Sequence, residues 1–300
     1  MAFFKELTNL NTSCFNHDEL EEMMQWYVIQ RGDGKDAPNG MTTHFFDAER
    51  HLHWFHYLET EEGNEESGSW RMDVHFDSGK ESDTLIQLEQ SSDVYLQTED
   101  NRFDTSLPAV WIHDEEKTPV VLEVANKNDL KGQGAGENIA VNLNMFAYNV
   151  EIINTKKDYN NRAKTVSLPK IGEFIPAGLV YSMVTSKDAD KRDPQFEALL
   201  QEVVQHYRVN PLTFANGIFK IKSFEQVATG EMTYLYKVIV DCQGADLCIV
   251  VPPFHAALKD LKKGRYIYVN GVMNAMILPE EDIRHKQDKK NNLLQFKQVH

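Results

Sequence analysis

Histidines are concentrated in the first part of the chain, and two of them have a spacing that suits a metal ion. His51 and His53 lie two residues apart in a run that alternates polar and apolar residues. Alternate residues of a β-strand face the same side, so both imidazoles would share one face, as zinc or non-haem iron ligands can. No HExxH motif or neighbouring cysteine completes a ligand set. We therefore keep both as metal candidates but expect no metal, no cofactor and no catalytic residue.

Tyrosines interleaved with basic residues form a second pattern, nearer the C-terminus. The two pairs of tyrosines each fall at strand spacing, so the members of a pair would share a face. An aromatic side chain that stacks a base contributes about 1 to 3 kcal/mol, which makes this set a candidate single-stranded nucleic-acid site. The alternative is core packing, because strands are rich in aromatic residues. The set comprises Tyr234, Tyr236, Tyr266, Tyr268, Lys237 and Arg265.

Three further motifs fail on their spacing. In residues 120–127, Lys127 stands four positions after Glu123, whereas metal-dependent nucleases place the lysine two after the acid. The glycines at 132, 134 and 136 lack the Lys-Ser/Thr that follows a phosphate-binding loop. Residues 188–193 lack the glycine and the final glutamate of a calcium loop. These patterns favour loops and a helix cap rather than chemistry.

Composition and charge indicate a soluble, globular, cytoplasmic protein. Of 300 residues 41% are hydrophobic, with no apolar run long enough to span a membrane and no signal-peptide pattern at the start. Three cysteines without a CxxC motif argue against a disulfide framework. Residues 1–150 carry 29 acidic and 10 basic side chains, whereas residues 151–300 carry 17 and 21. Such an acidic half favours a basic partner, although acidic surfaces also simply keep proteins soluble.

The elements that would position these residues are mostly strands. Residues 1–165 read as an acidic, β-rich domain: an amphipathic helix at about 17–31, then an antiparallel meander or barrel. Its alternating runs are 43–47, 51–59, 69–77, 84–90 and 93–99. A further strand pair follows at 109–112 and 119–125, and then a long apolar run at 138–153 that is either one bent strand or two. Residues 166–300 form the second domain, with a connecting strand at 174–184 and a helix at 194–207, which Asp193 caps and Pro194 begins. No internal repeat stands out. The predicted fold class is mainly β, a β-rich α+β protein.

Residues 214–278 read as a complete small domain. Strands are predicted at 217–224, 232–241 and 245–251, followed by a helix at 255–263 that Gly264 ends and a strand at 265–278, with a bulge or bend at Asn270 and Gly271. Three strands, a helix and a strand resemble the OB-fold, a small Greek-key barrel used mostly for binding. A fifth strand should close such a barrel. Residues 292–300 could supply it, or the sheet stays open.

Three functions remain open. The first is a non-catalytic cytoplasmic interaction protein that contacts a basic protein partner, or a second copy of itself, through its acidic surface. The second is a single-strand nucleic-acid binder that acts through the OB-like region. The third is an enzyme with a histidine-based metal site, and we leave enzymatic activity open while favouring its absence. No membrane partner is expected.

Overall fold

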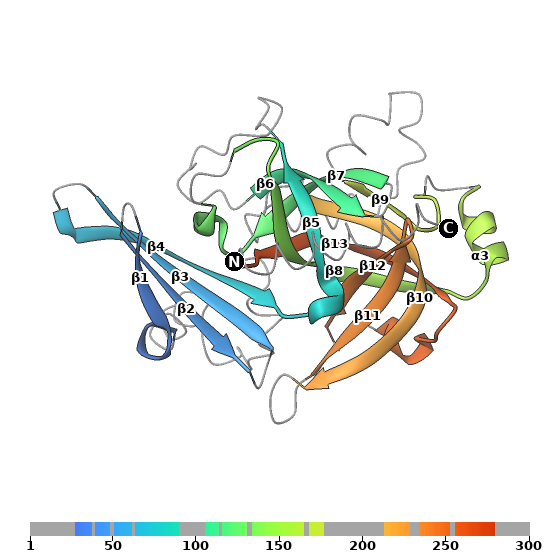
Figure 1. The fold of residues 1–300 in the computed structure, drawn as a ribbon. Coiled ribbons are helices and arrows are strands. Elements are labelled where there is room, and N and C mark those ends of the chain that lie inside the picture. The colour runs from blue at the N-terminus through green and yellow to red at the C-terminus, as the bar shows by residue number, and fades with distance from the viewer. Residues whose placement is uncertain are drawn as a thin grey trace, which may run out of the picture.

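The computed structural model describes residues 28–37, 40–48, 51–61, 64–89, 106–113, 116–130, 134–164, 168–176, 213–228, 234–252 and 256–279. Among these residues the strands form two sheets, one of four strands and one of eight. The fold is therefore mainly β, as the alternating patterns predicted. Figure 1 shows the larger sheet curled into a barrel-like body, with the smaller sheet projecting from its side.

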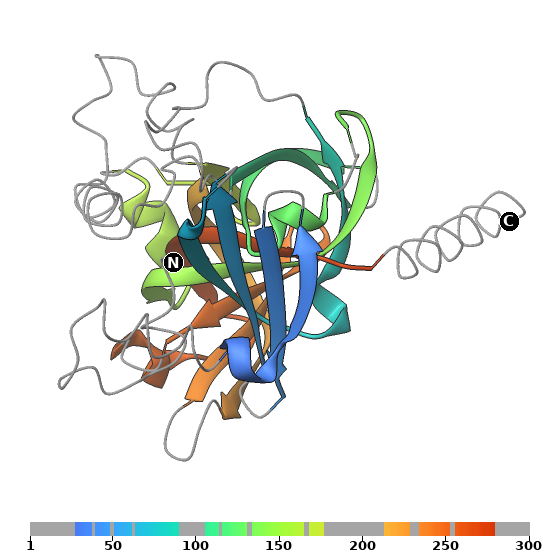
Figure 2. The same ribbon diagram turned by 90° about the vertical axis from the view of Figure 1, so that its left-hand side faces the viewer.

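The smaller sheet, which we call the arm, is an antiparallel meander in the order β1-β2-β3-β4. Its strands are β1 (Asp33–Ala37), β2 (Gly40–Asp47), β3 (Leu52–Glu61) and β4 (Asn64–Phe76). The predicted runs at 43–47, 51–59 and 69–77 fall in its last three strands. In Figure 2 the arm stands in front of the barrel and crosses one side of it.

The larger sheet follows the order β10-β11-β12-β8-β13-β7-β6-β5, with further pairings of β10 with β13 and of β8 with β5. We refer to it as the barrel. Its strands are β5 (Asp83–Leu88), β6 (Ser106–His113), β7 (Glu116–Val124), β8 (Asn138–Ile153), β10 (Phe214–Ala228), β11 (Tyr234–Cys242), β12 (Ala245–Val251) and β13 (Tyr266–Ile277). The remaining elements are η2 (Lys80–Ser82), η4 (Lys127–Asp129), α3 (Lys156–Arg162), β9 (Glu173–Pro176) and η7 (Ala256–Asp260).

Strand pairing in the barrel closes two rings that share β8 and β13. In the first ring β5 pairs with β6, β6 with β7, β7 with β13 in parallel, β13 with β8, and β8 with β5. In the second ring β10 pairs with β11, β11 with β12, β12 with β8 in parallel, β8 with β13, and β13 with β10. Each ring therefore contains three meandering strands, a 3₁₀ turn and a long strand, and borrows its fifth strand from the other.

This arrangement differs from two expectations and adds a repeat that the sequence does not show. The division into residues 1–165 and 166–300 does not separate the strands, because β8 pairs with β12 and β13 from the second part. The strand that closes the ring formed by β10 to β13 is β8 rather than residues 292–300, which lie outside the described residues. The two halves also repeat the same pairing scheme, although no repeat was visible in the sequence.

The two rings share a continuous hydrophobic core. Leu122 and Leu143 from the first ring belong to the same buried cluster as Val240 and Met273 from the second. Strand β8 contains one extra residue, Tyr148, where the register against β13 shifts between Asn270 and Gly271. The predicted bulge is thus present at Asn270 and Gly271, with its additional residue on the partner strand.

The predicted helices are only partly covered by the described residues. Residues 28–31 are helical and Gly32 follows them, as expected for the end of the first helix, while 17–27 lie outside the described part. The helix predicted at 194–207 and the strand at 93–99 also lie outside it, as does most of the strand at 174–184. The turn before β13 is short, since η7 spans five residues, and Gly264 has the predicted left-handed conformation with φ of 85°.

Candidate functional site: a buried network of histidines and asparagines

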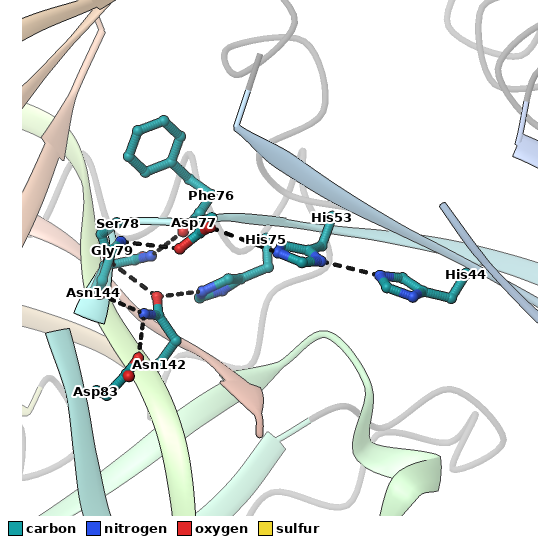
Figure 3. A network of polar contacts seen from close by, with 10 residues as sticks. All are labelled: His44, His53, His75, Phe76, Asp77, Ser78, Gly79, Asp83, Asn142 and Asn144. Atoms are coloured by element: carbon teal, nitrogen blue, oxygen red, sulfur yellow. Dashed lines mark hydrogen bonds and ion pairs between the residues drawn. The ribbon is translucent and has the colours of Figure 1, made fainter. Parts of the chain in front are cut away.

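A buried polar network joins the arm to the barrel (Figure 3). Its centre is His75, which lies near the end of β4 and has no exposed surface. Asn142 and Asn144 on β8 and Asn274 on β13 face it from strands that are mostly apolar, and each is at most 4% exposed. A buried amide is costly unless it is hydrogen-bonded, so these asparagines require hydrogen-bond partners.

Both nitrogens of the His75 ring face amide oxygens of the barrel. Nδ1 lies 2.5 Å from Oδ1 of Asn274, and Nε2 lies 3.0 Å from Oδ1 of Asn142. The amide nitrogen of Asn274 donates to the carbonyl oxygen of Glu123 over 3.3 Å. His75 is therefore clamped between the two strands that both rings share.

The segment between the arm and β5, together with the first residue of β5, fixes Asn142 from the other side. Nδ2 of Asn142 donates to the carbonyl oxygen of Gly79 at 3.0 Å and to Oδ1 of Asp83 at 2.8 Å. The hydroxyl of Ser78 donates to Oδ1 of Asn142 at 3.0 Å. Asn142 thus has its orientation set by two acceptors on its nitrogen and one donor on its oxygen.

Two further contacts hold the base of the arm. Nδ2 of Asn144 donates to the carbonyl oxygen of Phe76 at 2.9 Å, at the end of β4. The hydroxyl of Tyr57 donates to the carbonyl oxygen of Ala125 at 2.7 Å, and Phe55 and Tyr57 pack with Ala125 and Met276. The arm is therefore attached by both polar and apolar contacts.

The network continues along the arm through two more histidines. Nδ1 of His53 lies 3.0 Å from Nε2 of His44, and Nε2 of His53 lies 4.0 Å from a carboxylate oxygen of Asp77. Phenylalanine rings flank the pair: Phe46 lies 4.3 Å from His53 and Phe55 lies 4.6 Å from His44, measured between ring centroids. Phe46 is 41% exposed, so the row of rings reaches the surface at that end.

Burial keeps these histidines neutral at pH 7. It lowers the pKa of His53 to about 3, with His75 and His44 acting in the same direction and Asp77 opposing. Burial also lowers the pKa of His44, His56 and His75; for His75, the bonds to Asn142 and Asn274 and the charges of Asp77 and Asp83 act against it. A neutral imidazole has one donor and one acceptor nitrogen, which suits the bond between His53 and His44. His75 lies between two amide oxygens, and a neutral ring donates to only one of them.

The predicted metal pair does not form as expected. His51 lies in the turn before β3, exposed and with φ of 55°, so it is not on the strand face of His53. The pairing partner of His53 is His44 on the neighbouring strand. Within the described ranges, no three histidine, cysteine, aspartate or glutamate side chains come together as a metal site would require.

The predicted nucleic-acid set is divided between two faces of the barrel. Tyr236 packs against the core inside the barrel, and the ring of Tyr234 meets it edge-on at 5.5 Å. Tyr268 is 1% exposed and belongs, with Tyr266, to a separate cluster. In that cluster Arg162 lies over the Tyr268 ring, and Asn216 donates to its hydroxyl. The four tyrosines therefore do not form one stacking surface.

The two basic members of the set are engaged with acidic groups. The ammonium group of Lys237 lies 2.6 Å from Glu81 and 3.3 Å from Glu225, and its side chain is largely buried. Arg265 donates to the carbonyl oxygen of Asp260. The charge of each residue therefore lies beside a carboxylate or a carbonyl group.

Sequence reasoning missed most of the network. His44 and His75 belong to the cluster of histidines, but they were not singled out because neither stands at a ligand spacing. The signal that was available is the presence of asparagines at 142, 144 and 274 inside long apolar strands. A polar side chain in such a strand requires a buried partner, although the sequence does not say which one.

Comparisons of this chain with protein-family models, with curated proteins and with solved structures gave no match. Within the part of the chain that the structure describes, none of the helices combines the length and apolar character needed to cross a membrane.

Proposed function

We propose that this protein is a non-catalytic binding protein whose arm docks onto a basic surface of a protein partner. The observation that carries the proposal is the β3–β4 hairpin, which pairs from Leu52 with Phe76 at its base to Glu61 with Asn64 at its tip. At about 3.3 Å per residue, the tip lies roughly 35 Å along β4 from His75. Residues 59–66 contain five glutamates and no basic residue.

The anchoring of the arm supports a role in docking. The base of the hairpin is fixed to the barrel by His75, Asn144 and Tyr57, so the acidic tip is presented on a supported element. A preorganised surface binds more tightly because less conformational freedom is lost on association. Its concentrated negative charge would steer a basic partner and raise the rate of encounter.

A second candidate, single-strand nucleic-acid binding, is favoured by the pairing order of the rings. In each ring the third strand lies parallel to a borrowed fifth strand and the fourth lies beside the first. We propose that both rings are OB-like barrels, a fold that commonly binds oligonucleotides. We also propose a cytoplasmic location, which suits the free, buried thiols of Cys242 and Cys248.

Two matched double variants test the docking proposal. Glu65→Gln/Glu66→Gln removes two charges from the arm, and Glu89→Gln/Glu137→Gln removes two from exposed positions on the barrel. The probe is a fluorescent peptide of ten lysines, followed by anisotropy. We expect the arm variant to weaken the Kd about three- to tenfold, since an exposed ion pair contributes up to about 1 kcal/mol, and the barrel variant to weaken it less than twofold.

Salt and a second probe separate the two candidates. Peptide binding should weaken steeply above about 0.15 M salt, where the screening length is roughly 8 Å. Equal losses in both variants would contradict the arm as the docking surface. Tight binding of a twenty-nucleotide oligo(dT) that Tyr234→Ala abolishes, together with a lysine peptide indifferent to the arm charges, would establish the second candidate instead.

A further inference from the structure

The arm is an open sheet, and its two edge strands differ in how accessible they are. β4 forms one edge, and its last residues are buried where the arm meets the barrel around His75. β1 forms the other edge and, among the described residues, pairs only with β2. Each residue from Asp33 to Asp36 is exposed. The outer edge of β1 is therefore open to solvent.

The outer edge of β1 carries backbone groups that the sheet does not use. In an antiparallel pair, alternate residues direct their N–H and C=O groups toward the neighbouring strand, and the residues between them direct theirs away from it. The pairing of β1 with β2 is regular from Asp33 opposite His44 to Ala37 opposite Gly40, without a bulge that would turn the edge aside. A regular row of outward donors and acceptors is a template for another strand.

The strand register places this edge beside the acidic tip of the arm. Ala37, at the end of β1, lies opposite Gly40, and Gly40 lies opposite Glu59 on β3. Residues 59–66, with five glutamates and no basic residue, therefore begin at the same end of the arm. Asp33 and Asp36 extend the negative charge along β1, where Lys35 is the single basic residue.

Charge decides which kind of strand fits this edge. A second copy of the chain would bring the same acidic tip, and its net charge of −15 would repel the first copy. A basic segment instead brings lysine or arginine side chains to Asp33, Asp36 and the glutamates of the tip. Opposite charges across neighbouring strands stabilise their pairing, whereas like charges oppose it. The edge therefore favours a basic strand over a second copy.

We propose that a basic, extended segment of the partner binds the arm as an added strand, paired along the outer edge of β1. This inference rests on the proposed docking function and adds a backbone pairing to it. Main-chain hydrogen bonds supply affinity in such a complex, and alternate side chains of the added strand supply specificity. The five residues of β1 offer a ladder about 17 Å long, so we expect a small interface and a reversible complex.

A backbone-modified peptide separates strand addition from attraction between charges. The probe is a fluorescent peptide of ten residues in which lysine and threonine alternate, and its control carries a methyl group on every backbone nitrogen. Both peptides have the same charges, but the control has no N–H group to donate to β1. We expect the control to bind the parent chain at least about tenfold more weakly, because several hydrogen bonds are lost. Equal Kd values would overturn strand addition and leave docking by charge intact.

Hydrogen exchange and a charge variant then locate the added strand. In the parent chain, the outward N–H groups of β1 should exchange more slowly when the unmethylated peptide is bound, as followed by NMR. Asp33→Asn/Asp36→Asn should weaken the Kd about three- to tenfold, and Glu89→Gln/Glu137→Gln on the barrel less than twofold. Binding that requires Glu65 and Glu66 but leaves exchange in β1 unchanged would overturn this inference alone. Binding indifferent to every acidic group of the arm would contradict the docking function as well.

Discussion

Replacing Gly271 by alanine should destabilise the whole barrel, because this glycine lies where the two shared strands approach most closely. A Cβ at position 271 would stand 2.2 Å from the carbonyl oxygen and 2.9 Å from the carbonyl carbon of Phe146, and 3.2 Å from Cα of Ala147. All three are backbone atoms of β8. They cannot yield as the end of a flexible side chain would, so β8 or β13 must shift.

Two opposing effects set the magnitude. Glycine to alanine at a compatible position stabilises a protein by about 0.4 to 1 kcal/mol through the unfolded chain, and Gly271 does not have a positive φ. Overpacking of a filled interior costs about 1 to 3 kcal/mol, and a clash with backbone lies at the upper end. The steric term wins, and we expect a net loss of roughly 2 kcal/mol, or a fall in Tm of about 4 to 8 °C.

Thermal unfolding followed by circular dichroism measures this loss. The control is Gly134→Ala, because a Cβ at position 134 meets no atom within 4 Å and Gly134 also lacks a positive φ. The control should match or slightly exceed the parent chain. A Gly271→Ala variant whose Tm stays within about 2 °C of the parent would refute the close approach of β8 and β13.

Two more predictions concern buried groups. Asn126→Ala should lower the free energy of unfolding, measured in urea, by about 2 to 4 kcal/mol. The Asn126 side chain pairs with both the N–H and the carbonyl oxygen of Ile277, and its removal leaves both groups without that partner. A decrease below about 1 kcal/mol would count against this reasoning. Burial raises the pKa of Cys242 and of Cys248 to about 12, so in a Cys14→Ser chain at pH 8 neither thiol should react with Ellman's reagent until denaturant is added. Rapid reaction in the native state would show that these strands open readily.

Local pattern predicted most of the strands within the described residues. The meander of β10, β11 and β12 and the left-handed Gly264 follow from alternation and from turn residues, whereas the helix predicted at 255–263 is the shorter 3₁₀ segment η7. These features depend on neighbours within a few positions. Their prediction needed no knowledge of which distant strands pair.

Closure of the rings was not predictable in the same way. Strand β8 pairs in parallel with β12, where Cys248 meets Asn144, and β7 pairs in parallel with β13, where Glu123 meets Asn274. A parallel partner leaves no turn signal, and here it lies about a hundred or more residues away. The segment after Pro279 is too charged for a fifth strand, so the expectation fell on residues 292–300 or on an open sheet, although β8 had already provided the closing strand.

The site shows the same limit. The histidine cluster indicated that the arm carries titratable groups, but the alternation rule paired His51 with His53 because it assumed an unbroken strand. The positive φ of His51 ends that strand and moves its side chain out of the row. The neighbours of His53 are His44 and His75, which lie on the two adjacent strands. Neighbours across strands follow from the register of the sheet rather than from spacing in the sequence.

The arm is attached at the seam of the barrel rather than to one ring. Asn144 on β8 and Asn274 on β13 are direct partners in the register, and each contributes a contact to the end of β4. Since β8 and β13 belong to both rings, a distortion of either strand alters the closure of both. The contacts of Asn142 and Asn274 with His75 therefore depend on the geometry of the whole barrel. A larger residue at 271, which would push β8 and β13 apart, should also weaken the contacts between the arm and the barrel.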